Sequence, residues 1–109
     1  MMRFVALEKL INLHDGYTQK RRVGFDTVLL LQRDGTCYVI ESQCPHREQA
    51  LDAVHIDGAE IVCPSHGYRF SLRDGQLLHF SEEPCRGLRT WPVIYRDKTV
   101  GIEWDDLAR

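Results

Sequence analysis

The stretch CPHREQALDAVHIDGAEIVCPSHGYRF, from Cys44 to Phe70, carries two cysteine–histidine pairs. His46 follows the first cysteine, and in the second pair Cys63 is followed by His66. Thiolate and imidazole both bind borderline and soft metals, so these four side chains predict either a mononuclear zinc site or an iron–sulfur cluster. Zinc sites usually pair like ligands within one loop, whereas each loop here supplies one of each. The mixed loops therefore favour two metal ions that share both loops.

The sequence on both sides of this stretch predicts short strands separated by turns. Asp34-Gly35 lies between two runs of β-forming residues, which is a strong hairpin signal, and Asp74-Gly75 and Arg96-Asp97-Lys98 mark further turns. No segment has a sustained apolar period of 3.6, and residues 46–54 could form at most one or two helical turns. We predict an all-β fold of small antiparallel sheets, packed as a sandwich or barrel, with the Cys/His segment inserted between early and late strands. The expected strands are 3–7, 17–23, 27–33, 36–42, 54–57, 59–62, 90–95 and 99–104.

Length and composition predict one globular domain. The chain has 109 residues, of which 43% are hydrophobic, and a formal net charge of -2. That charge gives no dense basic field for nucleic acid or an anionic membrane surface. The longest apolar run, residues 28–31, is far too short for a bilayer span, and the N-terminus lacks the apolar segment of a signal peptide. We expect a cytoplasmic protein, in which the four cysteines favour metal binding over disulfides.

The motif resembles that of the Rieske family. C-P-H followed by C-P-S-H-G is similar to the family pattern C-x-H, a spacer of about fifteen to seventeen residues, and C-x-x-H, which holds a [2Fe-2S] cluster with two histidines in place of two cysteines. DGAEIVCPSHGYRFSLRDGQ resembles the cluster subdomain of the family, and EPCRGLRTWPV its proline-containing covering loop. The resemblance implies a single Rieske domain over residues 1–109, with the cluster-binding subdomain at about 43–83.

The resemblance also implies the ligands. Cys44 and Cys63 would bind the inner iron of one cluster per chain, and His46 and His66 the outer iron. We expect Pro45 and Pro64 to stiffen the two loops, Gly67 to allow close backbone approach, and Pro84 to lie in the covering loop. A glycine common in relatives is replaced here by Glu48.

Formal charge and hydrogen bonding together predict the reduction potential. Two ferric ions, two sulfides and two thiolates sum to zero, so reduction is easier than with four thiolates. Respiratory relatives add a disulfide between the loops and hydroxyl donors to the cluster. The corresponding positions here are Gln49 and Ser65, which cannot form that disulfide, and Tyr68 and Phe70, of which only the tyrosine has a hydroxyl. We expect a potential near the low end of the Rieske range, about -150 mV.

The family resemblance implies an electron carrier without catalytic residues of its own. It would be a soluble Rieske-type ferredoxin that passes electrons from a flavin-dependent NAD(P)H reductase to a terminal oxygenase of the ring-hydroxylating type, through transient contacts. The chain has no room for the catalytic domain of an oxygenase. Two alternatives stay open: the small subunit of an NAD(P)H-dependent nitrite reductase, and a zinc-stabilised interaction module without a redox role.

The remaining candidates receive structural interpretations. We expect Cys37 to be a packed thiol in a strand and Cys85 to be a spare thiol near the cluster rather than a fifth ligand. Five arginines could surround the cluster tip or form a scattered, solvated face. The expected core positions are Val28, Leu30, Val39 and Ile40. The five arginines are Arg47, Arg69, Arg73, Arg86 and Arg89. No function is assigned to His14, His55 and His79.

Overall fold

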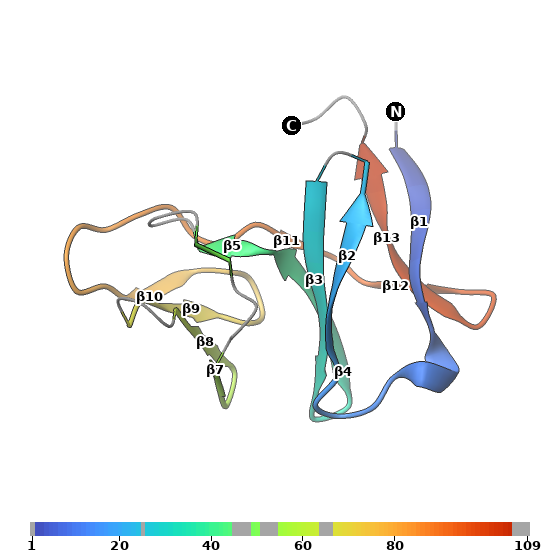
Figure 1. Cartoon of the computed structure of the whole chain (residues 1–109), viewed down its shortest axis with the longest axis horizontal. Coiled ribbons are helices and arrows are strands. Elements are labelled where there is room, and N and C mark those ends of the chain that lie inside the picture. The colour runs from blue at the N-terminus through green and yellow to red at the C-terminus, as the bar shows by residue number, and fades with distance from the viewer. Residues whose placement is uncertain (1, 25, 45–48, 51–54, 64–66, 106–109) are drawn as a thin grey trace. The chain divides into compact units, whose positions relative to one another are not determined.

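The computed structural model describes residues 2–24, 26–44, 49–50, 55–63 and 67–105. The chain divides into two compact units, the first formed by Met1–Val39 with Trp91–Arg109 and the second by Ile40–Thr90. Strands dominate the described part of both units (Figure 1). The predicted cluster-binding subdomain, at about 43–83, lies within the second unit. The single domain over residues 1–109 stays a prediction.

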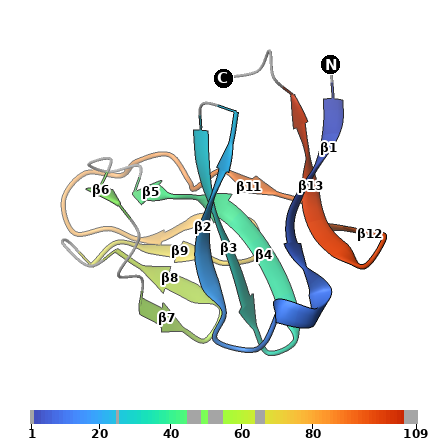
Figure 2. The same cartoon turned by 45° about the vertical axis from the view of Figure 1, so that its right-hand side comes forward.

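Antiparallel hairpins form the first unit. Strand β1 (Met2–Lys9) pairs with β13 (Thr99–Asp105), which also pairs with β12 (Ile94–Arg96), so β13 is the central strand of a three-stranded sheet. A second sheet has the order β11-β4-β3-β2 (Figure 2). Its strands are β2 (Thr18–Val23), β3 (Asp26–Arg33), β4 (Thr36–Glu41) and β11 (Thr90–Trp91), and a short 3-10 helix, Leu10–Asn12, follows β1.

The two sheets of the first unit share one hydrophobic core. Residues from β1, β2, β3, β4 and β13 meet in it, and the rings of Trp91 and Trp104 lie 5.5 Å apart at its edge. Val28 and Leu30 belong to this core, while Leu29 and Leu31 are equally buried on the opposite face of β3. The predicted core positions are therefore confirmed, and the all-β sandwich packing is confirmed for this unit. The core consists of Leu7, Tyr17, Val23, Val28, Leu30, Val39, Val100, Ile102 and Trp104.

The second unit contains two small sheets. One has the order β10-β9-β8-β7, and a two-stranded sheet pairs β5 with β6. Its buried apolar side chains include Ile61, Phe70 and Leu72, all 1% exposed or less. The strands are β5 (Gln43–Cys44), β6 (Gln49–Ala50), β7 (His55–Asp57), β8 (Glu60–Val62), β9 (Arg69–Ser71) and β10 (Leu77–His79).

Two details differ from the sequence-based expectations. The helical turns considered for residues 46–54 are wrong at Gln49–Ala50, which form β6 because they pair with the strand before the first loop; residues 46–48 and 51–54 lie outside the described residues. The strand expected over residues 90–95 is interrupted between β11 and β12. Pro92 lies at this break and has no N–H to donate to a neighbouring strand.

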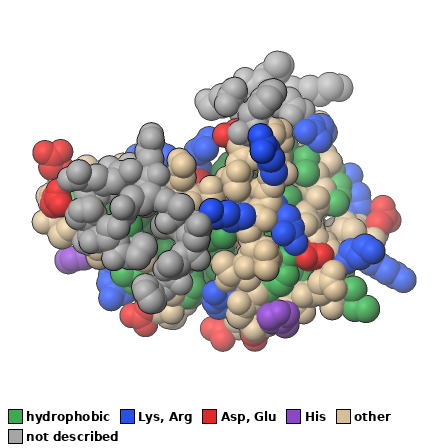
Figure 3. Space-filling view, viewed as in Figure 1, with side chains coloured by type: hydrophobic (Ala, Val, Ile, Leu, Met, Phe, Trp, Pro, Cys, Tyr) green, Lys and Arg blue, Asp and Glu red, His purple; other side chains and the backbone are tan. Residues whose placement is uncertain are grey.

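Charges of both signs are mixed on the surface. The face in Figure 3 carries Lys and Arg side chains as well as Asp and Glu side chains. The helix within the described residues, Leu10–Asn12, has three residues and is too short to span a bilayer. The cytoplasmic location and the absence of nucleic-acid and membrane partners stay predictions.

The two tight hairpin turns of the first unit provide a paired test of backbone strain. Asp34 and Gly35 have φ of 54° and 77°, and Asp97 and Lys98 have φ of 50° and 63°, so both turns need the left-handed conformation at their second position. A residue with a side chain pays about 1 to 2 kcal/mol for the left-handed conformation. Glycine avoids this strain, but it gains conformational entropy in the unfolded chain, which cancels part of the difference in stability. We expect Lys98→Gly to raise the free energy of unfolding by about 0.5 to 1 kcal/mol in urea denaturation.

The reverse substitution, Gly35→Lys, is the matched control and should lower the free energy of unfolding by about 1 kcal/mol. If Lys98→Gly destabilised the protein as well, backbone strain would not be what decides the preferred residue at this turn.

Candidate functional site

The second cysteine of the motif lies at the mouth of a tight loop between β8 and β9. The N–H of Cys63 donates to the carbonyl of Tyr68 over 2.7 Å, and the N–H of Gly67 donates to the carbonyl of Cys63 over 3.1 Å. Both bonds close the loop on itself. The Cys63 side chain is 2% exposed and is not in a disulfide, so the fold buries a free thiol at this point.

Gly67 stands where the chain reverses after the second cysteine–histidine pair. No described atom lies within 4 Å of the position that a Cβ would occupy, and the expected close approach of its backbone to a cluster stays a prediction. Its φ is +70°, a conformation that side chains rarely adopt. The glycine therefore lets the chain reverse between Cys63 and β9, with its own N–H committed to the Cys63 carbonyl.

The first loop is closed by strand pairing. In the β5–β6 sheet, Gln43 faces Ala50 and Cys44 faces Gln49, so the chain leaves and returns at adjacent positions (Figure 2). Both predicted cysteines thus lie at the base of a loop whose two ends are hydrogen-bonded to each other. The side chains of Cys44 and Gln49 are outside the described residues.

Most of the predicted site lies beyond what the structure describes. His46, Pro45, Arg47 and Glu48 of the first loop and Pro64, Ser65 and His66 of the second are outside the described residues. Among the residues that are described, no three Cys, His, Asp or Glu side chains form a group that could hold a metal ion. The ligand assignment therefore rests on the motif and on the two closed loops.

The segment of residues 81–89 follows β10 and is held to the second loop by a tyrosine; we call it the lid segment, after the covering loop that the family resemblance implies. Tyr68 is fully buried, and its hydroxyl donates to the carbonyl of Glu83 over 2.5 Å. A hydroxyl has one hydrogen to donate. Tyr68 occupies a hydroxyl-donor position of the family motif, and its hydrogen is thus donated to the lid segment. Phe70 is also fully buried and has no donor.

Cys85 of the lid segment is a half-buried free thiol beside the second loop. Burial raises the pKa of Cys85, the nearby Arg86 lowers it, and the neighbouring Cys63 raises it again. The two sulfur atoms therefore lie in one electrostatic neighbourhood, as expected for a spare thiol near the site. Cys37 is confirmed as a packed thiol in β4, with its sulfur 3.4 Å from the side-chain oxygen of Gln32.

Sequence reasoning missed a buried carboxylate next to this region. Glu41, at the end of β4, is 5% exposed, and its two oxygens accept from both terminal nitrogens of Arg86 over 2.6 and 2.9 Å. The backbone N–H of Arg89 donates to the same carboxylate over 2.8 Å, and the N–H of Glu41 donates to the Arg89 carbonyl over 2.9 Å. No local signal predicts this contact, because Glu41 and Arg86 are 45 residues apart in the sequence.

Another of the predicted arginines is also in ion pairs. Arg69 lies 3.2 Å from Asp57 and 3.3 Å from Glu60 on the exposed side of the β7-β8-β9 strands. Hydrogen bonds to these two carboxylates raise the pKa of Arg69 above its usual range. Arg69 and Arg86 are thus engaged with carboxylates of their own unit.

Two glycines bring the lid segment against the β9–β10 turn. A Cβ on Gly75 would lie 2.0 Å from the carbonyl oxygen of Leu88, and one on Gly87 would lie 2.6 Å from the carbonyl oxygen of Gly75. The N–H of Leu88 donates to that same Gly75 carbonyl over 2.8 Å. The predicted Asp74-Gly75 turn therefore serves both as a strand connection and as a docking point for the lid segment.

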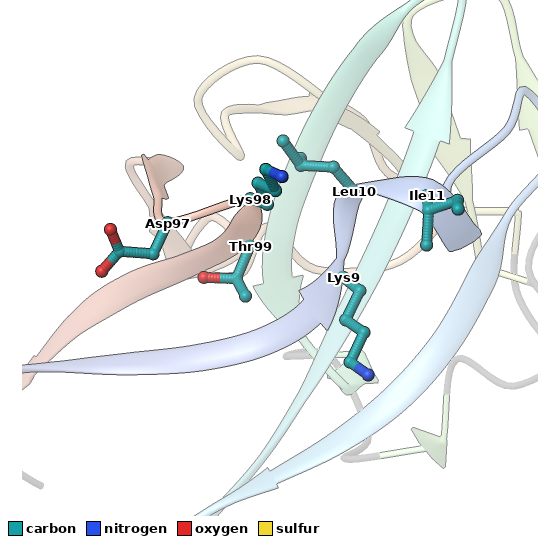
Figure 4. Close-up of a pocket in the computed structure, with 6 residues that line it drawn as sticks. All are labelled: Lys9, Leu10, Ile11, Asp97, Lys98 and Thr99. Carbon is teal, nitrogen blue, oxygen red and sulfur yellow. The ribbon is translucent and has the colours of Figure 1, made fainter.

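The first unit contains a separate surface hollow. It has a volume of about 460 Å³ and lies beside the turn between β12 and β13 (Figure 4). Its lining residues are Lys9, Leu10, Ile11, Asp97, Lys98 and Thr99.

Comparison with known proteins identifies the family and the fold of the chain. The family model for the Rieske [2Fe-2S] domain matches residues 3–92 of this chain. A 4beta-methylsterol monooxygenase of Methylococcus capsulatus is 32% identical over 97 residues, which cover 83% of this chain and 26% of that enzyme. The chain thus spans only about a quarter of that relative's length.

Smaller relatives match over most of their length. The ferredoxin component of the naphthalene 1,2-dioxygenase system of Pseudomonas putida is 27% identical over 74 residues, 68% of this chain and 69% of that protein. The solved structure of a ferredoxin from Sphingomonas yanoikuyae B1 superposes with a TM-score of 0.80 and 26% identity, over 94% of this chain and all of that one. The fold is therefore that of a Rieske ferredoxin.

The Tyr68 hydroxyl allows a test of the lid tether. Tyr68→Phe removes one hydrogen bond and leaves the Glu83 carbonyl without this donor, so we expect the free energy of unfolding to fall by about 1 to 2 kcal/mol in urea denaturation. Tyr38→Phe is the control, because the described residues show no partner for that hydroxyl; it should change the stability by less than about 0.5 kcal/mol. Equal losses in both variants would contradict the tether.

Proposed function

Because the chain belongs to the Rieske [2Fe-2S] domain family, we propose that it is a one-electron carrier whose cluster is held by Cys44, Cys63, His46 and His66. A [2Fe-2S] cluster is the cofactor of this domain. The two cysteines would bind one iron and the two histidines the other. The chain itself would have no catalytic residues.

The motif and the described parts of the two loops fit this cofactor. The donor set comprises two thiols and two imidazoles, which suits a Rieske cluster. Both cysteines lie at the base of loops closed by hydrogen bonds, and Cys63 is a buried thiol with no disulfide. A buried, preorganised thiol needs little rearrangement to become a ligand, and this observation carries the proposal.

When bound, the cluster supplies reversible one-electron transfer. The chain's own groups would do the rest: the Cys63–Tyr68 and Cys63–Gly67 hydrogen bonds fix the second loop, and buried Tyr68 and Phe70 exclude water behind it. The histidine ends of the loops would form the edge through which electrons enter and leave at a small, transient interface.

The proposed partners are a flavin-dependent NAD(P)H reductase as electron donor and a terminal oxygenase of the ring-hydroxylating type as acceptor. The likeness to a protein described as the ferredoxin component of a dioxygenase system supports the acceptor. The reductase is proposed because a one-electron carrier needs a source that splits hydride-derived electron pairs, which flavins do.

Metal content and spectroscopy test the cofactor site. Purified wild-type protein should be red-brown, contain two iron atoms per chain, and give a rhombic electron paramagnetic resonance signal after dithionite reduction. Cys63→Ser should lose most of the iron, whereas Cys37→Ala, which removes a buried thiol outside the loops, should keep it. Colourless protein with stoichiometric zinc would favour the interaction module, and a stable complex with a large reductase subunit would favour the nitrite reductase assignment.

The reduction potential tests the ligand set. We expect a midpoint potential of about -150 mV, because the described hydroxyl of Tyr68 is bonded to the lid segment and Phe70 has no donor to offer. His46→Cys would add a negative charge and should lower the potential in a spectroscopic redox titration. A wild-type midpoint well above zero, or an unchanged value in His46→Cys, would refute this assignment.

A further inference from the structure

The lid segment is mostly irregular and exposed, yet it is fixed at three points. Tyr68 holds the carbonyl of Glu83, the β9–β10 turn holds Leu88, and Glu41 holds Arg86 and Arg89. In Figures 1 and 2 this segment is the orange chain between β10 and β11, with no strand of its own. These contacts tie the lid segment to the rest of the second unit.

Of the three contacts, the one made by Glu41 involves a buried charge. A buried carboxylate is costly unless its oxygens are satisfied, and here a forked guanidinium and a backbone N–H satisfy them. The side chain of Glu41 is 7% exposed, whereas that of Arg86 is 55% exposed. The arginine thus reaches in from the surface to a carboxylate fixed at the end of β4, and losing it would leave an unpaired charge inside the unit.

The pair between Glu41 and Arg86 lies close to the proposed ligand loops. Arg86 lies three residues after Glu83, whose carbonyl accepts from the Tyr68 hydroxyl of the second loop over 2.5 Å. Glu41 is also three residues before Cys44 in the chain. The same ion pair therefore connects the strand that leads into the first loop with the segment that lies against the second.

We propose that Glu41 is a positioning residue that, with Arg86, latches the lid segment against the ligand loops and thereby slows loss of the cluster. This inference rests on the proposed function, since it assumes a cluster at those loops. The exposed pair between Arg69 and Asp57 in the same unit is not such a latch, because the Asp57 side chain is 73% exposed and surface pairs contribute little.

The test compares Glu41→Gln with Asp57→Asn, which removes the same charge from the exposed pair. Purified holoprotein is mixed with an iron chelator under anaerobic conditions, and the visible absorption is followed with time. We expect the absorption of Glu41→Gln to decay about tenfold faster than that of wild type, and that of Asp57→Asn to decay at the wild-type rate. Arg86→Lys keeps the charge but not the forked geometry, so its decay should be intermediate.

Hydrogen exchange separates a local latch from a general loss of stability. In Glu41→Gln and Arg86→Lys, we expect the amides of residues 86–89 to exchange faster, while those of β8 and β9 keep their protection. Decay of Glu41→Gln within twofold of wild type, or exchange that rises equally in all peptides, would overturn the latch. Wild-type protein without iron would instead refute the proposed function, and the exchange measurement would still decide whether Glu41 holds the lid segment.

Discussion

Two hydrogen bonds around Cys63 fix the chain reversal between β8 and β9 that keeps its thiol buried. The N–H of Cys63 donates to Tyr68 and its carbonyl accepts from Gly67, so the chain reverses within a few residues while the thiol stays buried. A looser loop would expose the thiol, and a continuous strand would carry the following residues away from it. The pairing of β8 with β9 follows from the same reversal, since Val62 then faces Arg69. The unit is thus organised around a cysteine held at a fixed depth.

The second unit compensates for short strands with polar tethers. Its strands have two or three residues each, apart from the end of β4, and such short pairings are weak by themselves. Fully buried side chains such as Ile61 and Phe70 form a small apolar centre, and the buried Glu41 carboxylate fixes the returning chain. Bonds to a buried charge are directional, so they define one position for a segment that hydrophobic contacts alone would hold loosely.

Short-range sequence signals predicted the strands and the core of the first unit well, because alternation and Asp-Gly turns act between near neighbours. These signals failed where a strand is interrupted by a single residue or where two contacting residues lie far apart in the sequence. Pro92 divides a run of β-forming residues that was expected to form one strand, whereas the turn expected at Arg96-Asp97-Lys98 is confirmed. The pair between Glu41 and Arg86 joins residues 45 apart, and neither has a neighbour that indicates the contact. The ligand residues stay a prediction of the motif, whereas the hydrogen bonds that close the two loops became visible only in the folded chain.

Tyr68 illustrates how one position in a motif can serve different ends. In respiratory relatives, hydroxyls from this region donate to the cluster and favour its reduced, more negative form. In this chain the hydroxyl of Tyr68 donates its single hydrogen to the Glu83 carbonyl instead. A hydrogen bond that would change the electron affinity of the cluster is thereby replaced by one that holds the lid segment. Since Phe70 has no hydroxyl to replace it, a low potential and a firmly tethered lid segment would share one structural cause.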